Sequence, residues 1–210
     1  MAESLTPEEA QTIESFDAIA EQWNQLSPAH WKDRLWYRYT DRLPQPASIV
    51  DLGCGTGRDA AFFREDGIRY VGIDLSFAML RVASRNNPEA NTGKEAVSFL
   101  RMSMYELGFR DRSFDGFWAT ASLLHIPRER LPLVLSGVRD LLKPRGIGFI
   151  SVPFGDSSGM YEGWSDQGHP ALCVCWDPEQ LISVLKTSGF STFSCEVLDL
   201  MVLLLVEKDA

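Results

Sequence analysis

The chain has 210 residues, 45% of them hydrophobic, which is enough for one α/β domain with a sizeable core. Its formal net charge of -9 disfavours broad nucleic-acid binding, because that function needs a basic surface. The sequence contains no apolar run of about 18 residues that would predict a membrane span, and its polar first residues do not fit a secretory signal. The four cysteines form no Cys-x-x-Cys motif and no cluster with histidine, so we expect reduced thiols, a cytoplasmic protein and no bound metal.

Residues 1–45 precede the first predicted strand, and we expect them to form a helical cap within a single domain spanning 1–210. Thr6-Pro7-Glu8-Glu9 is a typical helix start, with Thr as the N-cap, Pro in the first turn and Glu at the third helical position. A second helix is predicted after Ser27-Pro28. Most aromatic residues of this segment are expected to pack against the sheet, and one or two could line a substrate pocket.

A predicted buried strand over residues 48–52 leads into glycine at positions 53, 55 and 57, and then into a predicted helix. Strand, glycine turn and helix bring a ligand against bare backbone at a helix N-terminus, where a Cβ atom would block both the turn and the ligand. The pattern lacks the sixth-position glycine of the dinucleotide fingerprint, because Arg58 stands there. It also lacks the Lys-Ser/Thr ending of a phosphate-binding loop.

Two acidic residues narrow the choice of ligand. Asp74 ends the second predicted strand, where a carboxylate can accept hydrogen bonds from a ribose diol. Asp51 ends the first strand, where it could help to hold an ammonium group. A diphosphate would be disfavoured beside Asp51, whereas a zwitterionic amino acid would be tolerated. The ligand that combines a ribose with an amino acid is S-adenosylmethionine.

The rest of the chain alternates predicted strands with predicted helices, and it ends in an antiparallel pair. Ser76 is the predicted N-cap of the helix after the second strand, and Asp177 is that of the last helix. The remaining predictions are strands over 96–102, 114–120 and 148–152, a helix from Pro127 or Pro132 to Leu142, a loop over 153–170, an extended segment over 171–176, and closing strands over 190–198 and 201–206.

His125 follows the fourth predicted strand, at the carboxyl end that faces the ligand crevice in open α/β sheets. An imidazole there could act as a general base toward an attacking hydroxyl or amine. It could equally bond to the backbone and close the turn, and both interpretations stay open. The long loop supplies Tyr161, Trp164 and His169 as secondary candidates for substrate contacts, with an exposed loop of no such role as the alternative.

Together these motifs resemble the class I S-adenosylmethionine-dependent methyltransferases. The resemblance covers roughly residues 46–153. It implies an α/β, Rossmann-like methyltransferase fold: a seven-stranded, mostly parallel sheet with an antiparallel last strand and helices on both faces. The motifs that carry it are Val50-Asp51-Leu52-Gly53-Cys54-Gly55-Thr56-Gly57, Gly72-Ile73-Asp74-Leu75-Ser76 with Met79-Leu80, Ser113-Phe114-Asp115-Gly116, and Leu142-Lys143-Pro144 with Gly146.

The resemblance also implies roles for individual residues. The segment from Phe16 to Trp23 is similar to part of the family's lid over the methyl donor. Ser103 stands where the family usually has an Asp that accepts from the adenine amino group, and Arg145 stands where it usually has Gly. The expected cofactor-binding residues are Trp23, Asp51, Gly53, Cys54, Gly55, Asp74, Leu75, Ser103, Met104 and Ala119.

The implied activity is transfer of a methyl group from S-adenosylmethionine to an oxygen or nitrogen of a small molecule, with S-adenosylhomocysteine as product and no metal. We expect a monomer or homodimer without a nucleic-acid or membrane partner. Two alternatives stay open. One is an RNA-modifying methyltransferase, for which Lys32, Arg34 and Arg38 would form the basic patch. The other is a protein that binds S-adenosylmethionine without methyl transfer, as a cyclase or pseudoenzyme.

Overall fold

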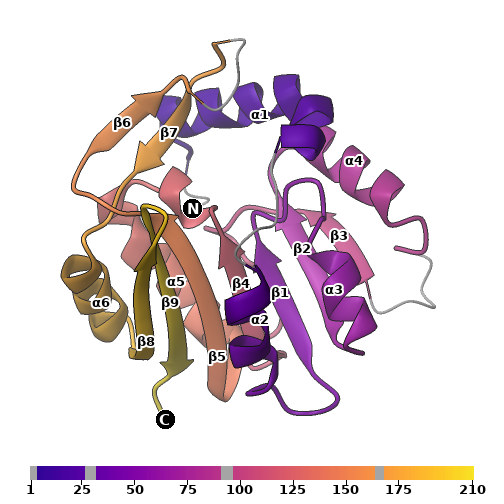
Figure 1. The fold of residues 1–210 in the computed structure, drawn as a ribbon, viewed down its shortest axis with the longest axis vertical. Helices are drawn as coiled ribbons and strands as arrows, with labels where there is room; N and C mark the ends of the chain where they lie inside the picture. Colours follow the sequence, from indigo (N-terminus) through magenta and orange to yellow (C-terminus); the bar gives the residue numbers. More distant parts are fainter. Residues whose placement is uncertain (1–3, 27–31, 91–96, 164–167) are drawn as a thin grey trace.

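The computed structural model describes residues 4–26, 32–90, 97–163 and 168–210. At its centre is a seven-stranded sheet with the strand order β3-β2-β1-β4-β5-β9-β8 (Figure 1). The first five strands are mutually parallel, whereas β9 is antiparallel to both β5 and β8. This confirms the predicted sheet. The strands are β1 (Ser48–Leu52), β2 (Arg69–Asp74), β3 (Val97–Arg101), β4 (Phe114–Thr120), β5 (Leu142–Pro153), β8 (Phe190–Leu198) and β9 (Met201–Lys208).

Apolar residues along the central strands serve two cores, one on each face of the sheet. In β4, Phe117 and Ala119 pack into one core, and Trp118 between them packs into the other. Successive side chains of a strand point to opposite faces, so a strand covered on both sides reads as a continuous apolar run. The Trp118 indole stacks on Phe149 of β5 with 4.2 Å between ring centroids.

Helices cover both faces, as predicted. One face carries α2 (Lys32–Thr40), α3 (Ala60–Glu65) and α4 (Phe77–Asn86), and Figure 1 shows α2 and α3 in front of the sheet. The other face carries α5 (Leu131–Leu141) and α6 (Pro178–Thr187). Within the described segments, no helix is long and apolar enough to cross a membrane.

The predicted N-caps of three helices are present. Helix α1 (Pro7–Leu26) begins with a reciprocal pair, in which the Glu9 amide donates to Thr6 Oγ1 and the Thr6 amide donates to the Glu9 carboxylate. Ser76 caps α4 by accepting from the Met79 amide. Asp177 caps α6 in the same way. These side chains satisfy backbone donors that a helix leaves open at its first turn.

Helix α1 lies across the carboxyl ends of the strands and roofs that edge of the sheet (Figure 1). Its Asp17 side chain accepts hydrogen bonds from Ser76 Oγ at 2.6 Å and from the Ala78 amide at 3.0 Å, at the start of α4. On the other side, Ser15 Oγ donates to the Pro170 carbonyl at 2.6 Å. The roof is therefore fixed at both flanks by contacts that are distant in sequence.

Two stretches differ from the prediction. The loop predicted over 153–170 contains a strand, β6 (Ser158–Tyr161), which pairs antiparallel with β7 (Ala171–Val174). Its exposed and partly polar sequence lacks the apolar alternation on which strand prediction relies. Strand β5 begins at Leu142 rather than Gly148, because Leu142 pairs with Phe114 ahead of a bulge. The segment between Leu142 and Gly148 includes Arg145 in a left-handed conformation, with φ 62°.

Candidate functional site

A cavity of about 340 Å³ lies between α1 and the carboxyl ends of β1, β2 and β4. Most of the predicted cofactor-binding residues line it, and so does His125. The short helix η1 (Leu123–His125), which follows β4, forms part of the wall. This is the edge at which open α/β sheets bind their ligands.

The glycine turn after β1 forms the floor of the cavity. Gly53, Gly55 and Gly57 all have positive φ angles, at 72°, 53° and 68°, which side chains rarely adopt. A Cβ atom on Gly53 would lie 2.6 Å from Ser122 Cβ, so this position also needs glycine for space. A Cβ atom on Gly55 would meet nothing within 4 Å, so the turn leaves open room there for a ligand.

Asp74 connects the end of β2 to the glycine turn. One carboxylate oxygen accepts from the Gly55 amide at 2.9 Å, and the other accepts from the Ser76 amide at 2.8 Å. Burial raises the pKa of Asp74, and the backbone hydrogen bonds oppose that shift. Each oxygen retains a further lone pair, so the carboxylate can also accept from a diol.

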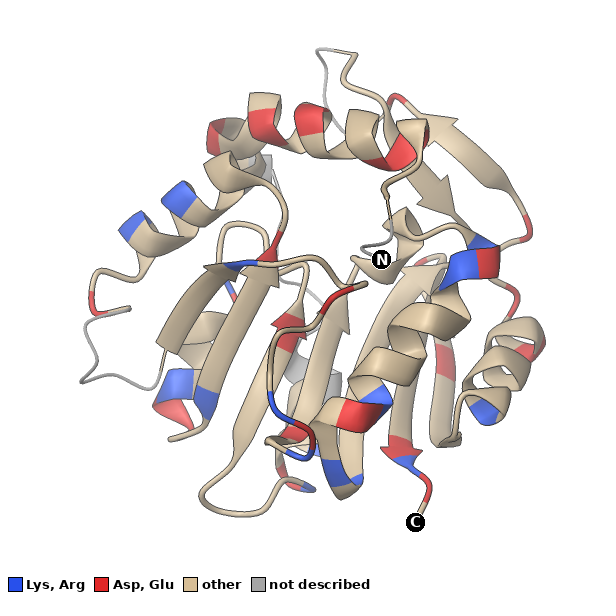
Figure 2. Ribbon diagram, turned by 180° about the vertical axis from the view of Figure 1, so that it is seen from behind, with Lys and Arg blue, Asp and Glu red and all other residues tan. Residues whose placement is uncertain are grey.

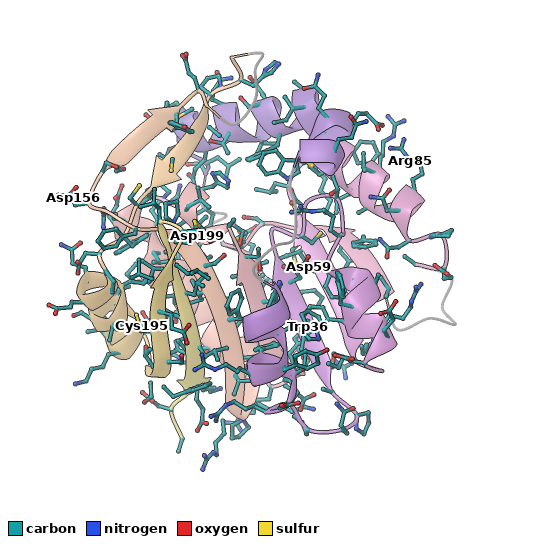
Figure 3. The ribbon with its side chains drawn as sticks, in the orientation of Figure 1. Trp36, Asp59, Arg85, Asp156, Cys195 and Asp199 are labelled. Carbon is teal, nitrogen blue, oxygen red and sulfur yellow. The ribbon has the colours of Figure 1, made fainter. Side chains whose placement is uncertain are left out.

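Charged residues flank the glycine turn, with Asp51 before it and Arg58 and Asp59 after it, and only Asp51 was predicted from the sequence. Asp51 is 3% exposed and accepts a hydrogen bond from Tyr70 Oη at 2.5 Å. Asp59 is 7% exposed and accepts from Trp118 Nε1 at 2.7 Å. Both line the cavity together with Arg58, and Figure 3 labels Asp59 near the centre of the molecule. Such a set can bind the ammonium and carboxylate groups of an amino acid.

Arg58 and Asp59 were not predicted as site residues. Their signal is their position, since they directly follow the last glycine of the turn, at the N-terminus of α3. A residue at the start of a helix beside a glycine turn lies close to whatever that turn binds. Their position directly after the glycine turn is therefore a sequence signal for the site.

The predicted cofactor-binding residues Leu75, Ser103 and Met104 line the cavity, and so does Met102, which was not predicted. Ser103 Oγ accepts a hydrogen bond from the Tyr105 amide at 3.1 Å and so stabilises its own turn. Cys54 also lies in the wall, and burial raises the pKa of its thiol well above the usual value. A protonated thiol there acts as a small apolar group.

His125 lies under the roof in η1, which follows β4, and β1 separates β4 from β2, the strand that Asp74 ends. Its Nδ1 is 2.6 Å from the Leu172 carbonyl of β7, and its ring packs edge-on against Phe16 at 5.0 Å. A carbonyl oxygen can only accept, so Nδ1 carries the proton and Nε2 carries the lone pair. Burial lowers the pKa of His125 to about 4, and the hydrogen bond to Leu172 opposes that shift. The imidazole is therefore neutral at pH 7.

Three predicted residues do not line the cavity. Ala119 is fully buried within β4, and the next three residues, Thr120, Ala121 and Ser122, form the wall in its place. The wall begins at Thr120, the last residue of β4 as predicted, and Ala121 follows it in a left-handed conformation with φ 46°. Tyr161 is 52% exposed on β6, and His169 lies just before β7. Trp164 lies outside the described residues.

The two helices of the predicted cap have different positions. Helix α1 lines the cavity through Phe16 and Trp23 among others. Helix α2 packs on the face of the sheet, where Trp36 and Tyr39 contact Phe63. Figure 3 labels Trp36 there, well below α1.

The basic patch considered for RNA is not assembled by the described side chains. Arg38 forms an ion pair with Glu196 and donates to Ser194 Oγ at 2.7 Å, and the side chains of Lys32 and Arg34 lie outside the described residues. Helix α1 contains several Asp and Glu residues and no Lys or Arg. Figure 2 shows these acidic residues along the roof of the cavity. No group of three or more His, Cys, Asp or Glu side chains within the described segments is arranged to hold a metal ion.

Residues 49–146 match a family model described as a methyltransferase domain. The chain is 34% identical over 97 residues to the O-methyltransferase rstn1 of Aspergillus nomiae, a match that covers 46% of this chain and 42% of that protein. It spans less than half the length of the curated relatives it matches.

Two solved structures resemble the whole chain in fold. One is 1,6-didemethyltoxoflavin-N1-methyltransferase of Burkholderia thailandensis, bound to 1,6-didemethyltoxoflavin and S-adenosylhomocysteine, with a TM-score of 0.75 and 22% identity over 100% of this chain and 93% of that one. The other is the [4+2]-cyclase SpnF, with a TM-score of 0.76 and 19% identity over 98% of each chain. Fold, glycine turn and family match together define a methyltransferase domain. Residues 49–146 are therefore similar to a methyltransferase domain, and the chain has the fold of the class I S-adenosylmethionine-dependent methyltransferases.

Proposed function

We propose that this protein transfers the methyl group of S-adenosylmethionine to an oxygen or nitrogen of a small-molecule acceptor. The observation that carries the proposal is the convergence of Asp74, the glycine turn and Asp51 on one cavity that also contains His125. The first three suit the ribose and amino-acid ends of the donor. His125 lies in the same cavity, where it could orient an acceptor.

The chain's own residues have mainly positioning roles in this reaction. The donor, when bound, supplies an activated methyl group, so the lone pair of the acceptor forms the new bond as the carbon–sulfur bond breaks and its electrons remain on sulfur. Alignment of the two substrates accounts for much of the acceleration in such a displacement. Roofing by α1 excludes water, which would otherwise compete with the acceptor for the same space.

His125 is the proposed group that receives the acceptor proton or orients it. Its neutral state at pH 7 matters twice. A neutral ring can accept a hydrogen bond through Nε2, and it does not repel the positive sulfonium as an imidazolium would. With a pKa of about 4 it is a weak base, so it fits an acceptor that loses its proton as the new bond forms.

Two measurements test the proposal. Calorimetry with S-adenosylhomocysteine should show one site per chain, and absence of binding would contradict the proposal at its first step. A panel of hydroxyl- and amine-bearing metabolites is then incubated with S-adenosylmethionine and read by mass spectrometry. The expected result is an acceptor that gains one methyl group while an equal amount of S-adenosylhomocysteine forms.

The same screen separates the alternatives. Steeply salt-dependent binding of transfer RNA would favour an RNA-modifying enzyme. Donor binding without S-adenosylhomocysteine formation across the panel would favour a cyclase or pseudoenzyme. The likeness to SpnF concerns the fold alone and does not favour that reading.

A further inference from the structure

The cavity has a second half, away from the glycine turn, whose walls are mostly hydrocarbon. It lies between α1, η1 and the facing ends of β5 and β9, where Pro153 pairs with Met201. We call it the apolar subsite. Its apolar residues are Leu5, Ile13, Phe16, Leu124, Ile126 and Met201.

Two polar side chains that border the apolar subsite, Thr12 and His125, already have partners within the protein. Thr12 Oγ1 donates to the Glu8 carbonyl at 2.7 Å and accepts from the Leu172 amide at 2.8 Å. The Nδ1–H of His125 is used by the Leu172 carbonyl. These bonds fasten α1 and η1 to β7. The buried hydroxyls of Thr120 and Ser122, which also line the cavity, have no hydrogen-bond partner among the described residues, so this part of the wall offers a ligand neutral hydroxyl groups but no cation.

Charge at the edge of the subsite is compensated in the same way. Glu9 is 5% exposed, and its carboxylate accepts from Tyr105 Oη, from Arg130 of the short helix η2 (Arg128–Arg130) and, at 2.8 Å, from the Thr6 amide. The Arg130 guanidinium also lies 4.1 Å from the Tyr105 ring centroid and donates to the Ser4 carbonyl. The arginine is thus committed to the wall.

An anionic acceptor would find little to pair with in this half. Among the described residues that line the cavity, Arg58 is the only Lys or Arg. It lies beside Asp59, directly after the glycine turn. The other charged cavity residues are the carboxylates Glu9, Asp51, Asp59 and Asp74. Burying an unpaired charge is costly, and nearby like charges add to that cost.

We propose that the apolar subsite selects an uncharged, apolar acceptor body and rejects acceptors that carry a carboxylate or phosphate on that body. This inference rests on the proposed methyl transfer, because it assigns the second half of the same cavity to the acceptor. It narrows the acceptor to a neutral molecule whose reactive hydroxyl or amine is attached to a hydrophobic ring or chain.

A matched pair of probes tests the selection. We choose 2-naphthol and 6-hydroxy-2-naphthoate, which share a ring system and a hydroxyl and differ by one carboxylate. Binding of each is measured by calorimetry to the protein saturated with S-adenosylhomocysteine. The neutral compound should bind at least about tenfold more tightly, since the carboxylate would be desolvated without a partner. Equal or tighter binding of the naphthoate, or binding of neither compound, would overturn the inference.

Adding a positive charge to the wall tests whether the apolar subsite is where the probe binds. Ile13→Lys places a cation in the apolar subsite and should lower the preference for 2-naphthol by at least about tenfold. Leu5→Lys is a second variant at a site that is already 37% exposed, in case the first disturbs folding. The matched control is Leu133→Lys, on the exposed side of α5, which should keep the wild-type preference.

The outcomes separate the two proposals. If S-adenosylhomocysteine does not bind, the proposed function fails, and the naphthol pair is then measured on the unliganded protein to test the subsite by itself. If S-adenosylhomocysteine binds but the preference is unchanged in both folded Lys variants, the apolar subsite is not where the probe lies, and this inference fails alone.

Discussion

The half of the cavity that contains the glycine turn and Asp74, here called the donor half, is made from neighbouring turns of one parallel sheet. The apolar subsite is assembled from segments far apart in the chain. In the donor half, the Asp74 carboxylate accepts a hydrogen bond from the Gly55 amide, and the two residues lie at or just after the ends of strands that pair side by side. In the apolar subsite, Glu9 meets Arg130, 121 residues further along. Short motifs can encode the first kind of site, and only the complete fold can encode the second.

The largest effect is expected from removing the charge that anchors the start of α1. Glu9→Gln preserves the capping geometry but leaves Arg130 without its buried partner, and it should lower the free energy of unfolding by about 3 kcal/mol. Urea unfolding measures this. The matched control is Glu8→Gln, at an exposed neighbouring position, where less than about 0.5 kcal/mol is expected. Affinity for S-adenosylhomocysteine should remain within about twofold, because the donor half does not use Glu9.

The reciprocal experiment disrupts the donor half. Asp74→Ala removes the acceptor for the Gly55 and Ser76 amides as well as the proposed ribose contact. It should weaken S-adenosylhomocysteine binding by about 100-fold, since hydrogen bonds to charged groups contribute about 1.5–3 kcal/mol each. Calorimetry measures the change. Asp156→Ala, at the outer edge of the molecule in Figure 3, serves as the control. Unchanged affinity in the Asp74 variant would remove the ribose assignment.

Acid should destabilise the folded protein through His125, a residue of η1 that contacts Phe16 of the roof and Leu172 of β7. Its pKa is about 4 in the folded protein and 6.5 in its unperturbed state, so below pH 6.5 the unfolded chain binds more protons. The contribution is complete above pH 6.5 and is lost as the pH falls toward 4. Between pH 7 and pH 5 it amounts to about 2 kcal/mol. Urea unfolding of wild type and His125→Asn at both values measures it, and equal pH slopes would contradict the assignment.

A smaller effect is expected on turnover from the same histidine. His125→Ala should lower the rate of methyl transfer by about tenfold or more if the imidazole accepts or orients the proton. Affinity for S-adenosylhomocysteine should not change, because β1 separates the strand before His125 from the strand that Asp74 ends. Wild-type turnover in this variant would reduce His125 to the structural role shown by its bond to Leu172.

The smallest effect is expected where the two halves meet. Ala121 has a left-handed backbone that its amide stabilises by donating to Ser151. Ala121→Gly should change the free energy of unfolding by less than about 0.5 kcal/mol, because glycine adopts this conformation without strain but loses more entropy on folding. Ala121→Val should cost about 1–2 kcal/mol for the opposite reason. Thermal unfolding of the two variants compares them directly.

This contrast explains which parts could be predicted from the sequence. The main strands, three helix caps and most of the donor half follow from local patterns, such as Ser76 before α4 and glycine at 53, 55 and 57. The cap of α1 was predicted through Thr6 and Glu9. The second role of Glu9, as the partner of Arg130 and Tyr105, was not, because it depends on how distant elements pack.

The errors have a similar origin. Ala119 lies one residue before the cavity wall, because the correctly predicted end of β4 does not tell which of its last residues face the cavity. Strand β6 escaped prediction because it is exposed and pairs with β7 only after the chain has turned back. The sequence left Tyr161 as either a substrate contact or part of an exposed loop, and the hairpin holds it on the surface.

The position of β9 inside the sheet has a consequence for synthesis. Because this strand inserts between β5 and β8, the sheet stays open until residues 201–208 have left the ribosome, although the glycine turn and Asp74 emerge much earlier. Met201, at the start of that strand, is part of the apolar subsite. A nascent chain can thus form much of the donor half before the apolar subsite is complete.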